Sequence, residues 1–327
     1  MKAAVIVGEG DSRRLQIQNV PRPEAGPTEV LVAVRAAGLN RADLSLSAGH
    51  FRKVGGAPAA PISGLEMAGE VLAVGDQTAG VKKGDRVMAM AARAYAEYAV
   101  VDYRLAIPVP PDWPWELAAA SPVALMTAHD AVMTNGRLAP GESVLVQAAS
   151  TGVGIIAVQI AKLRGAAMVM GTSTSPAKIE RLKALGMDKG IDVKREDFAA
   201  RVLELTKERG ADLIIDHVGA GALDGNMRCA AIRGRIVNIG RMSGLKGEID
   251  LDLLSLKRLH LIGVTFRTRS VEEISTLIQR LRDDLWADVL AGRVHQVLDR
   301  SFPLDEAAAA LSYMKSNAHF GKIVLTL

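Results

Sequence analysis

Hydrophobic and polar positions follow one pattern in the first third of the chain and another pattern after it. Up to about residue 120, short apolar segments of strand length alternate with glycine and proline, which end regular elements. We expect strands at residues 3–7, 30–36, 69–74, 85–90 and 96–101. This part of the chain is therefore predicted to be an irregular, mostly β unit.

From there on, apolar runs of strand length alternate with segments of helical periodicity, at the spacing of βαβ units. About six parallel strands with helices between them form a doubly wound nucleotide-binding fold. The expected strands cover residues 143–147, 167–171, 190–193, 212–216, 235–239 and 259–264, and the expected helices cover 152–163, 176–185, 198–208 and 226–231.

The end of the chain is mixed again. It predicts helices at 271–291 and 304–314, an extended segment at 297–302 and a closing strand at 322–325. The long helix is the expected point of return to the first domain, so the nucleotide domain is inserted into the other one. We expect one domain at 1–122 and 268–327, and the second at 123–267.

Length and composition agree with a globular protein of two domains. The 327 residues exceed what one hydrophobic core ordinarily supports, and 49% apolar with 23% charged residues is no signature of disorder. The net charge of +4 comes from Lys and Arg interleaved with Asp and Glu, and aromatic residues make up only 4%. A nucleic-acid partner is therefore not expected.

Cysteine usage and hydropathy restrict the location and the metal chemistry. Cys229 is the only cysteine, so neither an internal disulfide nor a four-thiolate zinc site can form. The apolar run at 3–7 is too short for a signal peptide, and no stretch reaches the ~20 apolar residues of a membrane span. We expect a cytoplasmic protein with no membrane partner.

The first strand, turn and helix of the second domain have the pattern of a phosphate-binding site. Backbone N–H groups of such a turn, with the positive end of the helix dipole, point at a phosphate. The turn lacks two glycines of the usual fingerprint, so the alternative is a helix that only packs closely on a strand. The residues expected to contact a dinucleotide here are Ala149, Ser150, Gly152, Val153 and Gly154.

The end of the next strand indicates which dinucleotide is bound. An NAD site needs an acidic residue there for the adenosine ribose, whereas this chain has Ser173, followed by Lys178 and then Arg181. Hydroxyl and cationic groups suit the 2′-phosphate of NADPH. The alternative is that Ser175 caps a helix and Lys178 is a solvated side chain.

Two later strand ends carry glycines, Gly219 and Gly240, where a ring or a ribose could approach the backbone. Each is also compatible with an ordinary turn.

Seven segments together resemble the quinone oxidoreductase branch of the medium-chain dehydrogenases/reductases, and the resemblance covers essentially the whole chain. They are 38–43 (GLNRAD), 61–69 (PISGLEMAG), 81–87 (VKKGDRV), 95–98 (YAEY), 126–128 (MTA), 149–154 (ASTGVG) and 320–325 (FGKIVL). The resemblance implies an α/β fold in which a mostly-β GroES-like catalytic domain holds an inserted doubly wound parallel-sheet (Rossmann) domain.

The resemblance also indicates zinc-free chemistry. The zinc-dependent alcohol dehydrogenases of this superfamily have a Cys where this chain has Asn40 and a His where it has Leu65. Glu66 alone cannot hold a catalytic zinc ion. Hydride transfer then requires an electron-poor acceptor, so we expect a quinone, or an electron-poor carbonyl such as an enone or enal.

Asn40 is the candidate catalytic residue, and Asn40 and Phe51 are the candidate substrate residues. Asn40 is expected to donate an amide hydrogen bond to the acceptor or to the nicotinamide ribose, or alternatively to cap a helix with Asp43 three residues on. Phe51 stands where enoyl reductases of the family often carry a Tyr, and it can stack on a flat acceptor but cannot donate a proton. No general acid is obvious, and His50 is the nearest candidate.

By the same resemblance, the nicotinamide is expected near Asn40, Thr127 and Gly240, with Phe266 close by and Asn317 contributing to cofactor binding from the tail. A homodimer is expected through the edge strand at 259–264. Three activities remain open: an NADPH:quinone reductase, an NADPH-dependent enone or enal reductase, and an NADPH-binding protein with little turnover.

Overall fold

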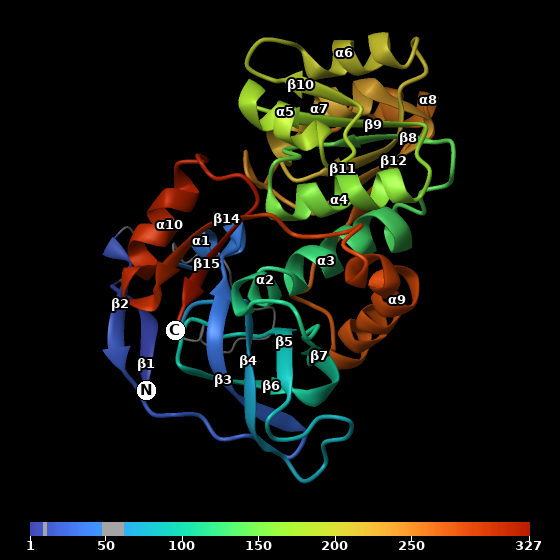
Figure 1. Ribbon diagram of the computed structural model, residues 1–327. Helices are drawn as coiled ribbons and strands as arrows, with labels where there is room; N and C mark the ends of the chain where they lie inside the picture. Colours follow the sequence, from blue (N-terminus) through green and yellow to red (C-terminus); the bar gives the residue numbers. More distant parts are fainter. Residues whose placement is uncertain (9–11, 48–61) are drawn as a thin grey trace. The chain divides into compact units, whose positions relative to one another are not determined.

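The computed structural model describes residues 1–8, 12–47 and 62–327. They form two compact units (Figure 1). The first unit comprises Met1–Ala124, Phe266–Asp284 and Gln296–Leu327, and the second comprises Leu125–Thr265 and Leu285–His295. This division differs from the expected one by two residues at 123–124 and at 266–267, and at residues 285–295, which the sequence pattern places in the first unit.

The first unit contains two β-sheets. Its strands are β1 (Lys2–Val7), β2 (Arg14–Asn19), β3 (Glu29–Gly38), β4 (Glu66–Val74), β5 (Arg86–Met90), β6 (Tyr98–Asp102), β7 (Ile107–Pro108), β14 (Leu298–Pro303) and β15 (Lys322–Thr326). β1 and β2 form a two-stranded sheet, and the seven-stranded sheet has the order β14-β15-β3-β4-β5-β7 with β6 paired to β3. β14 and β15 run parallel, and the other pairs are antiparallel.

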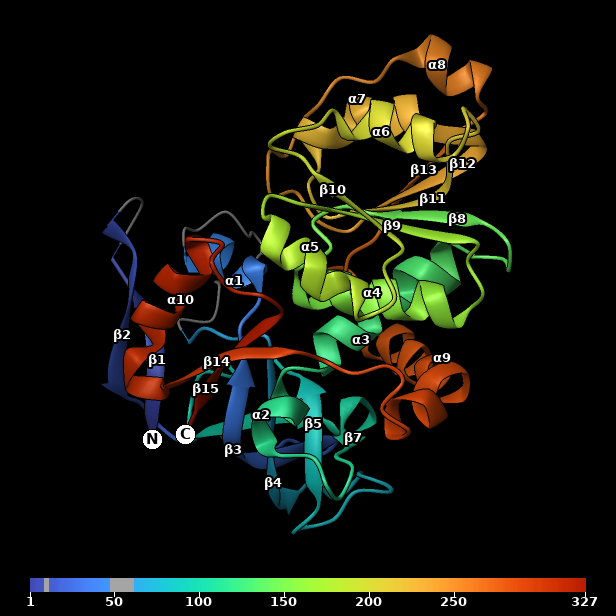
Figure 2. The same cartoon turned by 45° about the horizontal axis from the view of Figure 1, so that its top comes forward.

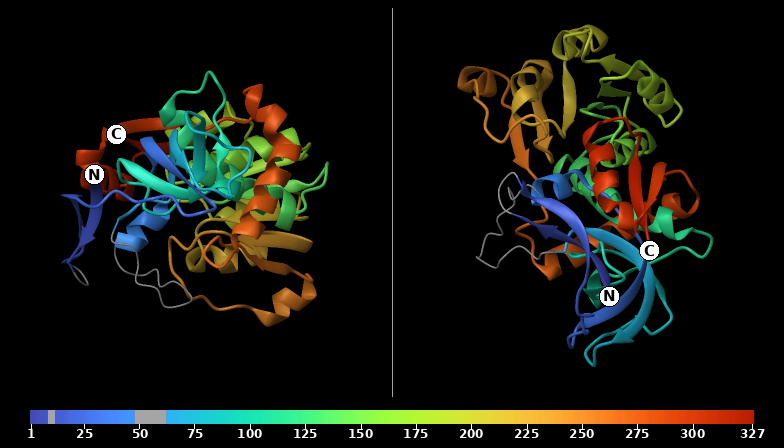
Figure 3. Two further views of the ribbon diagram at one scale, coloured as in Figure 1. Left: turned by 90° about the horizontal axis from the view of Figure 1, so that it is seen from below. Right: turned by 90° about the vertical axis from the view of Figure 1, so that its left-hand side faces the viewer.

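The core of the first unit lies around β3, which pairs with β4, β6 and β15. Its Val30, Leu31, Val32 and Val34 are all buried, as expected of a strand covered on both faces. The helices of this unit are α1 (Arg41–Ser47), α2 (Trp115–Ala119) and α10 (Ala307–Lys315), with 3₁₀ helices η2 (Tyr103–Leu105) and η4 (Leu304–Glu306). Both chain termini belong to this unit (Figure 3).

The second unit is a six-stranded parallel sheet in the order β10-β9-β8-β11-β12-β13. Its strands are β8 (Ser143–Val146), β9 (Met168–Ser173), β10 (Lys189–Asp192), β11 (Ala211–Asp216), β12 (Ala230–Asn238) and β13 (His260–Gly263). Its helices are α4 (Gly152–Leu163), α5 (Pro176–Lys183), α6 (Phe198–Leu205), α7 (Ala220–Cys229) and α8 (Leu251–Leu256). Helices α4 and α5 lie on one face of the sheet, and α6 and α7 on the other (Figure 2).

The direction of winding reverses at β8. The chain passes from β8 to β9 and β10 on one side, and then returns to β11 on the other side of β8. In such sheets, ligands bind in the crevice outside the carboxyl ends of the strands at this switch point. The doubly wound sheet confirms the expected α/β fold and places the candidate site before any side chain is considered.

Two helices join the units in the chain: α3 (Pro122–His129), continued by a π-helical segment η3 (Asp130–Asn135), and α9 (Val271–Leu290).

The predicted elements agree best with the structure where the hydrophobic periodicity extends over many residues. Helix α4 has the predicted bounds, and α9 ends one residue early. The predicted helix at 226–231 is wrong in its bounds, because the helix starts at Ala220 and β12 already begins at Ala230. Strands β2 and β7 and helices α2, α3 and α8 were absent from the prediction, because they are short or lie in segments rich in proline and glycine. Helix α1 was expected only as the helix that Asn40 would cap, and it does start after Asn40.

Within the described residues, no helix is long and apolar enough to cross a membrane.

Candidate functional site

The turn between β8 and α4 is built from backbone groups and small residues. Thr151 caps the helix, and its side-chain oxygen accepts a hydrogen bond from the Gly154 N–H at 3.0 Å. A Cβ on Gly154 would lie 2.7 Å from the Ala149 carbonyl oxygen, so only glycine lets the helix start this close to the strand. The positive end of the α4 dipole therefore stands directly above the end of β8.

The backbone of this turn is held in an uncommon conformation. Ala148 has φ +48°, in the left-handed region that costs a non-glycine residue ~1–2 kcal/mol. Its N–H donates to the Thr172 hydroxyl at 2.8 Å, and the Ala149 N–H donates to the Thr172 carbonyl at 2.9 Å. Thr172 thus fixes the turn from the neighbouring strand β9.

A chain of buried side chains continues beneath the turn. The Thr172 hydroxyl donates to Gln147 Oε1 at 2.8 Å, and Gln147 Nε2 donates to Asn226 Oδ1 at 2.7 Å. All three residues are at most 2% exposed, so these hydrogen bonds are sheltered from water. They connect β9, β8 and α7 beneath the crevice.

The end of β9 carries the residues predicted to select the cofactor. Ser173 is the last residue of β9 and is buried, while Lys178 lies in the first turn of α5. Asp192, at the end of β10, lies beside Ser173 in the sheet register, a neighbour that was not predicted from the sequence. Its carboxylate accepts from the Lys194 N–H at 3.1 Å and lies 3.5 Å from the Arg195 guanidinium. Positive charge therefore stands beside this carboxylate.

Glycines at the ends of β11 and β12 allow close approach of the backbone. Gly219 has φ +82°, and a Cβ on Gly240 would lie 2.3 Å from the His217 carbonyl oxygen. Beside them lies a hollow of about 240 Å³ lined by Asp216, Asn238 and Leu261, among others. Local geometry therefore explains both glycines: a positive φ at Gly219 and close packing at Gly240. Both lie at the carboxyl end of the sheet, as predicted.

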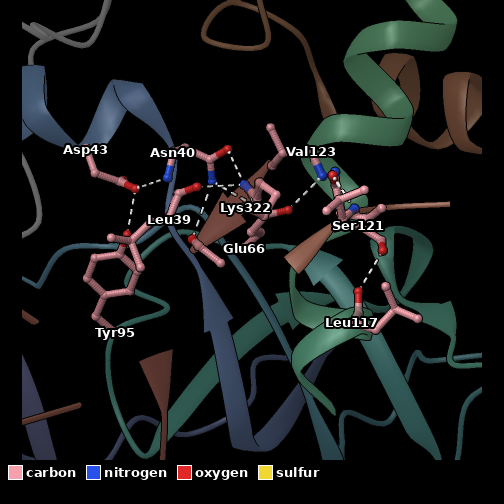
Figure 4. Close-up of polar contacts among 12 residues, drawn as sticks. Leu39, Asn40, Asp43, Glu66, Tyr95, Leu117, Ser121, Val123 and Lys322 are labelled. Carbon is pink, nitrogen blue, oxygen red and sulfur yellow. Dashed lines mark hydrogen bonds and ion pairs between the residues drawn. The ribbon is translucent and has the colours of Figure 1, made fainter. Parts of the chain in front are cut away.

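In the first unit, Lys322 and Glu66 form a buried ion pair (Figure 4). Lys322 Nζ donates to the Leu39 carbonyl at 2.6 Å, to Asn40 Oδ1 at 2.9 Å and to the Glu66 carboxylate. Glu66 is 0% exposed and Lys322 5%. All three ammonium protons therefore have an acceptor.

The same carboxylate collects two further donors. Asn40 Nδ2 donates to Glu66 Oε1 at 2.9 Å, and the Val123 N–H, at the start of α3, donates to Glu66 Oε2 at 2.9 Å. A Cβ on Gly38 would lie 2.5 Å from Glu66 Oε1, so the carboxylate requires glycine there. Because Asn40 faces an ammonium with one end and a carboxylate with the other, the orientation of its amide is unambiguous.

Asp43 and Tyr95 extend the cluster. The Tyr95 hydroxyl and the Asn40 N–H both donate to Asp43 Oδ2, at 2.6 and 2.7 Å. In the bond from Asn40, the N-cap N–H donates to the side chain three residues on, which is one of the two hydrogen bonds of a capping box at the start of α1. Burial raises the pKa of Asp43 to about 6, and burial beside Asp43 raises the pKa of Tyr95 well above its usual value. The Tyr95 hydroxyl therefore remains protonated and directed at Asp43.

The donor set of this cluster does not fit a zinc ion. Asn40 and Leu65 offer neither a thiolate nor an imidazole, and both oxygens of Glu66 already accept hydrogen bonds. Across the described part of the chain, no three His, Cys, Asp or Glu residues are grouped so that they could hold a metal ion.

The structure brings most of the predicted cofactor residues of the second unit to one edge of its sheet. Ala149, Ser150, Gly152, Val153, Gly154, Ser173, Lys178, Gly219 and Gly240 all follow or border the carboxyl ends of β8, β9, β11 and β12. Thr127 belongs to the same unit, on α3. Gln147, Thr172 and His217 were not predicted from the sequence, because their roles depend on neighbouring strands.

Asn40, Phe266 and Asn317 belong to the first unit. Asn317 Oδ1 accepts a hydrogen bond from the Arg41 guanidinium, and Asn317 has φ +59°. Lys322 was also missed as a site residue. His50 and Phe51 lie outside the described residues. The expected meeting of Asn40 and Phe266 with Thr127 and Gly240 involves both units and stays a prediction.

Comparisons with known proteins agree with this architecture. The family described as "Alcohol dehydrogenase GroES-like domain" matches residues 26–111, and the one described as "Zinc-binding dehydrogenase" matches 152–283. The chain is 32% identical to a quinone oxidoreductase of Pseudomonas aeruginosa over 97% of this chain and 96% of the relative. It superposes on a crystal structure of Escherichia coli quinone oxidoreductase complexed with NADPH with a TM-score of 0.88, at 26% identity, covering 100% of this chain and 99% of that one.

A second kind of relative is much longer. The chain is 32% identical to a phenolphthiocerol/phthiocerol polyketide synthase of Mycobacterium tuberculosis, over 96% of this chain but only 14% of the synthase. It therefore spans about a seventh of that relative's length.

The fold is that of a protein built from a GroES-like and a Rossmann domain. The chain belongs to the medium-chain dehydrogenase/reductase superfamily and, within it, to the quinone oxidoreductase branch.

Proposed function

We propose that the chain is an NADPH-dependent reductase that transfers a hydride to a quinone without a metal ion. The observation that carries this proposal is the crevice at the switch point of the sheet, where the α4 turn, Ser173 and Lys178 follow the carboxyl ends of adjacent strands. The structural relative from Escherichia coli is complexed with NADPH, which supports the same cofactor here.

The residues of the crevice fit this cofactor. When bound, NADPH supplies two electrons as a hydride from its nicotinamide ring. The α4 turn, from Ala149 to Gly154, would hold the pyrophosphate on its N–H groups. Ser173 would donate to the 2′-phosphate, and Lys178 would add positive charge. Arg195, 3.5 Å from Asp192, would reduce the repulsion between that carboxylate and the phosphate.

In the first unit, Lys322 and Glu66 form an ion pair, so the Glu66 carboxylate has a counter-charge without a metal ion. The ammonium and the carboxylate neutralise each other, and the Asn40 amide lies between them with a fixed orientation. Because such a site offers no Lewis acid, the acceptor must already be electron-poor. A quinone meets this requirement: hydride plus one proton from water gives the hydroquinone, so no fixed proton donor is needed.

Asn40 and Phe51 are the residues that we propose for contact with the acceptor, and Thr127, Phe266 and Asn317 for further contacts to the cofactor. The Asn40 amide already donates to Glu66 at 2.9 Å, and its second donor contact, to the Gly38 carbonyl, is 3.4 Å. The proton of this longer contact is the one that a ligand could take over.

A second candidate is reduction of an enone or enal, which the match to a polyketide synthase favours. The hydroxyl of Tyr95 is committed to Asp43 and cannot serve as the proton donor of that reaction. A third candidate is an NADPH-binding protein with little turnover.

We also propose a homodimer through β13. This strand ends the sheet, and among the strands that the structure describes it pairs only with β12. Leu261 on β13 is 37% exposed, and Leu251 and Leu256 on α8 are 69% and 73% exposed. An open apolar edge favours pairing with a second copy. The mass in solution tests this: Leu261→Lys should convert a dimer to a monomer, whereas a monomeric parent contradicts it.

The function is tested by following NADPH oxidation with a naphthoquinone and a short enal side by side, with NADH as the control. Turnover of the quinone with preference for NADPH supports the proposal. Turnover of the enal alone favours the second candidate, and tight NADPH binding without consumption of either acceptor favours the third.

A further inference from the structure

His217 lies at the centre of the carboxyl edge of the nucleotide-binding sheet. It directly follows β11, which pairs with β8 at the switch point of the sheet. Gly240, at the end of β12, packs against its backbone so closely that a Cβ would lie 2.3 Å from the His217 carbonyl oxygen. The residue is therefore part of the edge at which a dinucleotide binds.

The hydrogen bonding of the ring fixes its tautomer. His217 Nδ1 lies 2.7 Å from the Gln147 carbonyl oxygen, which can only accept, so Nδ1 carries the hydrogen. Burial lowers the pKa of His217, and the ring is neutral at neutral pH. Nε2 is then a hydrogen-bond acceptor, directed away from the Gln147 carbonyl by the geometry of the ring.

This acceptor has no hydrogen-bond partner in the part of the chain that the structure describes, although His217 is only 6% exposed. The neighbouring polar side chains are committed elsewhere. Gln147 bonds Thr172 and Asn226, and Asp216 accepts from the Val218 and Gly219 N–H groups and from Asn238. A buried acceptor without a donor is unfavourable, and in native proteins it commonly marks a group that a ligand or water satisfies.

The position along the sheet indicates which part of a dinucleotide supplies the donor. The α4 turn follows β8 and would hold the pyrophosphate, and the adenosine ribose would then lie toward the end of β9. The nicotinamide half would then extend to the other side, over the ends of β11 and β12. The donors in that half are the ribose hydroxyls and the carboxamide NH₂.

We propose that His217 Nε2 accepts a hydrogen bond from the nicotinamide half of the bound dinucleotide and thereby positions it in the crevice. This inference rests on the proposed NADPH binding. His217 is thereby assigned as a positioning residue, whose Nε2 accepts from a hydrogen-bond donor on the ligand.

Two variants separate the two nitrogens of the ring. In His217→Asn, the amide nitrogen can replace Nδ1 as donor to the Gln147 carbonyl, but the Nε2 acceptor is lost. In His217→Gln, the amide oxygen can reach the position of Nε2, but the bond to Gln147 is lost. Dissociation constants would be measured by fluorescence titration with NADPH and with adenosine 2′,5′-bisphosphate, which lacks the nicotinamide half, and the thermal midpoint of each apoprotein would monitor folding.

We expect H217N to raise the NADPH dissociation constant about three- to tenfold, the effect of one neutral hydrogen bond, with no change for the bisphosphate. H217Q should stay within about twofold of the parent for both ligands. Unchanged NADPH affinity in H217N, or an equal loss for both ligands, would overturn the assignment while NADPH binding by the parent still stood. Failure of the parent itself to bind NADPH would instead overturn the proposed function and this inference with it.

Discussion

Asp43 offers a prediction whose sign and size follow from the structure. Its carboxyl is 0% exposed, its Oδ2 accepts from Tyr95 and from the Asn40 N–H, and burial raises its pKa from 3.8 to about 6. Between these two values, the folded protein keeps a proton that the unfolded chain has lost. The free energy of unfolding contributed by Asp43 must therefore fall as the pH rises through this window.

The magnitude follows from the shift. A rise of about two pKa units corresponds to about 3 kcal/mol, present in full below pH ~4 and lost by pH ~6.5. Asp43→Asn keeps an oxygen for Tyr95 and the Asn40 N–H but does not titrate. The variant should therefore equal the parent in stability near pH 4 and exceed it by about 3 kcal/mol near pH 7.

The assay is urea-induced unfolding of both proteins at half-unit steps from pH 4 to pH 7.5, because their difference cancels the titration of every other group. Asp305→Asn, an exposed carboxylate of the same unit, is the matched control and should give a flat difference. Parallel stability curves of the parent and D43N would refute the reasoning, and so would a difference that grows toward low pH.

Three further predictions concern the buried pair, the turn and the cofactor. Lys322→Met leaves the buried Glu66 carboxylate without its counter-charge and should lower the free energy of unfolding in urea by about 3–5 kcal/mol. Adding Glu66→Gln should restore part of this loss in the double variant. A loss below about 1 kcal/mol would contradict the importance of the pair. Ala148→Gly relieves a left-handed alanine and should raise the free energy of unfolding by about 0.5–1 kcal/mol in the same assay; a decrease would show that φ +48° is not strained there. Ser173→Asp brings a carboxylate to the 2′-phosphate position and should weaken NADPH relative to NADH about tenfold, equal to about 1.4 kcal/mol, in paired titrations; an unchanged ratio would remove Ser173 from the cofactor site.

The elements of the second unit are well predicted from the sequence, because each follows from residues that are close together in the chain. Strand and helix periodicities alternate from residue 143 on, and each βαβ crossover fixes the side of the sheet on which the next strand is placed. The helix start at Gly152 follows from a cap and two glycines within four residues. The same locality explains the failure at α7, where the Gly219 turn rather than periodicity sets the start of the helix.

The polar cluster of the first unit could not be predicted, because its partners are distant in sequence. Lys322 and Glu66 are separated by 256 residues, and Tyr95 and Asp43 by 52. Nothing in the run 320–325 distinguishes Lys322 from a solvated strand residue until β15 is placed beside β3. Likewise, Asp192 and Ser173 become neighbours only through the register of β10 and β9.

The measurement that tests the central claim most directly is NADPH-dependent reduction of a naphthoquinone by protein whose metal content has been measured before and after treatment with a chelator. The account predicts that metal-free protein retains its full kcat/KM and that added zinc does not raise it. The reason is that Lys322, the Asn40 amide and the Val123 N–H already occupy both oxygens of Glu66. Loss of quinone turnover on chelation, with recovery on adding zinc, would contradict it.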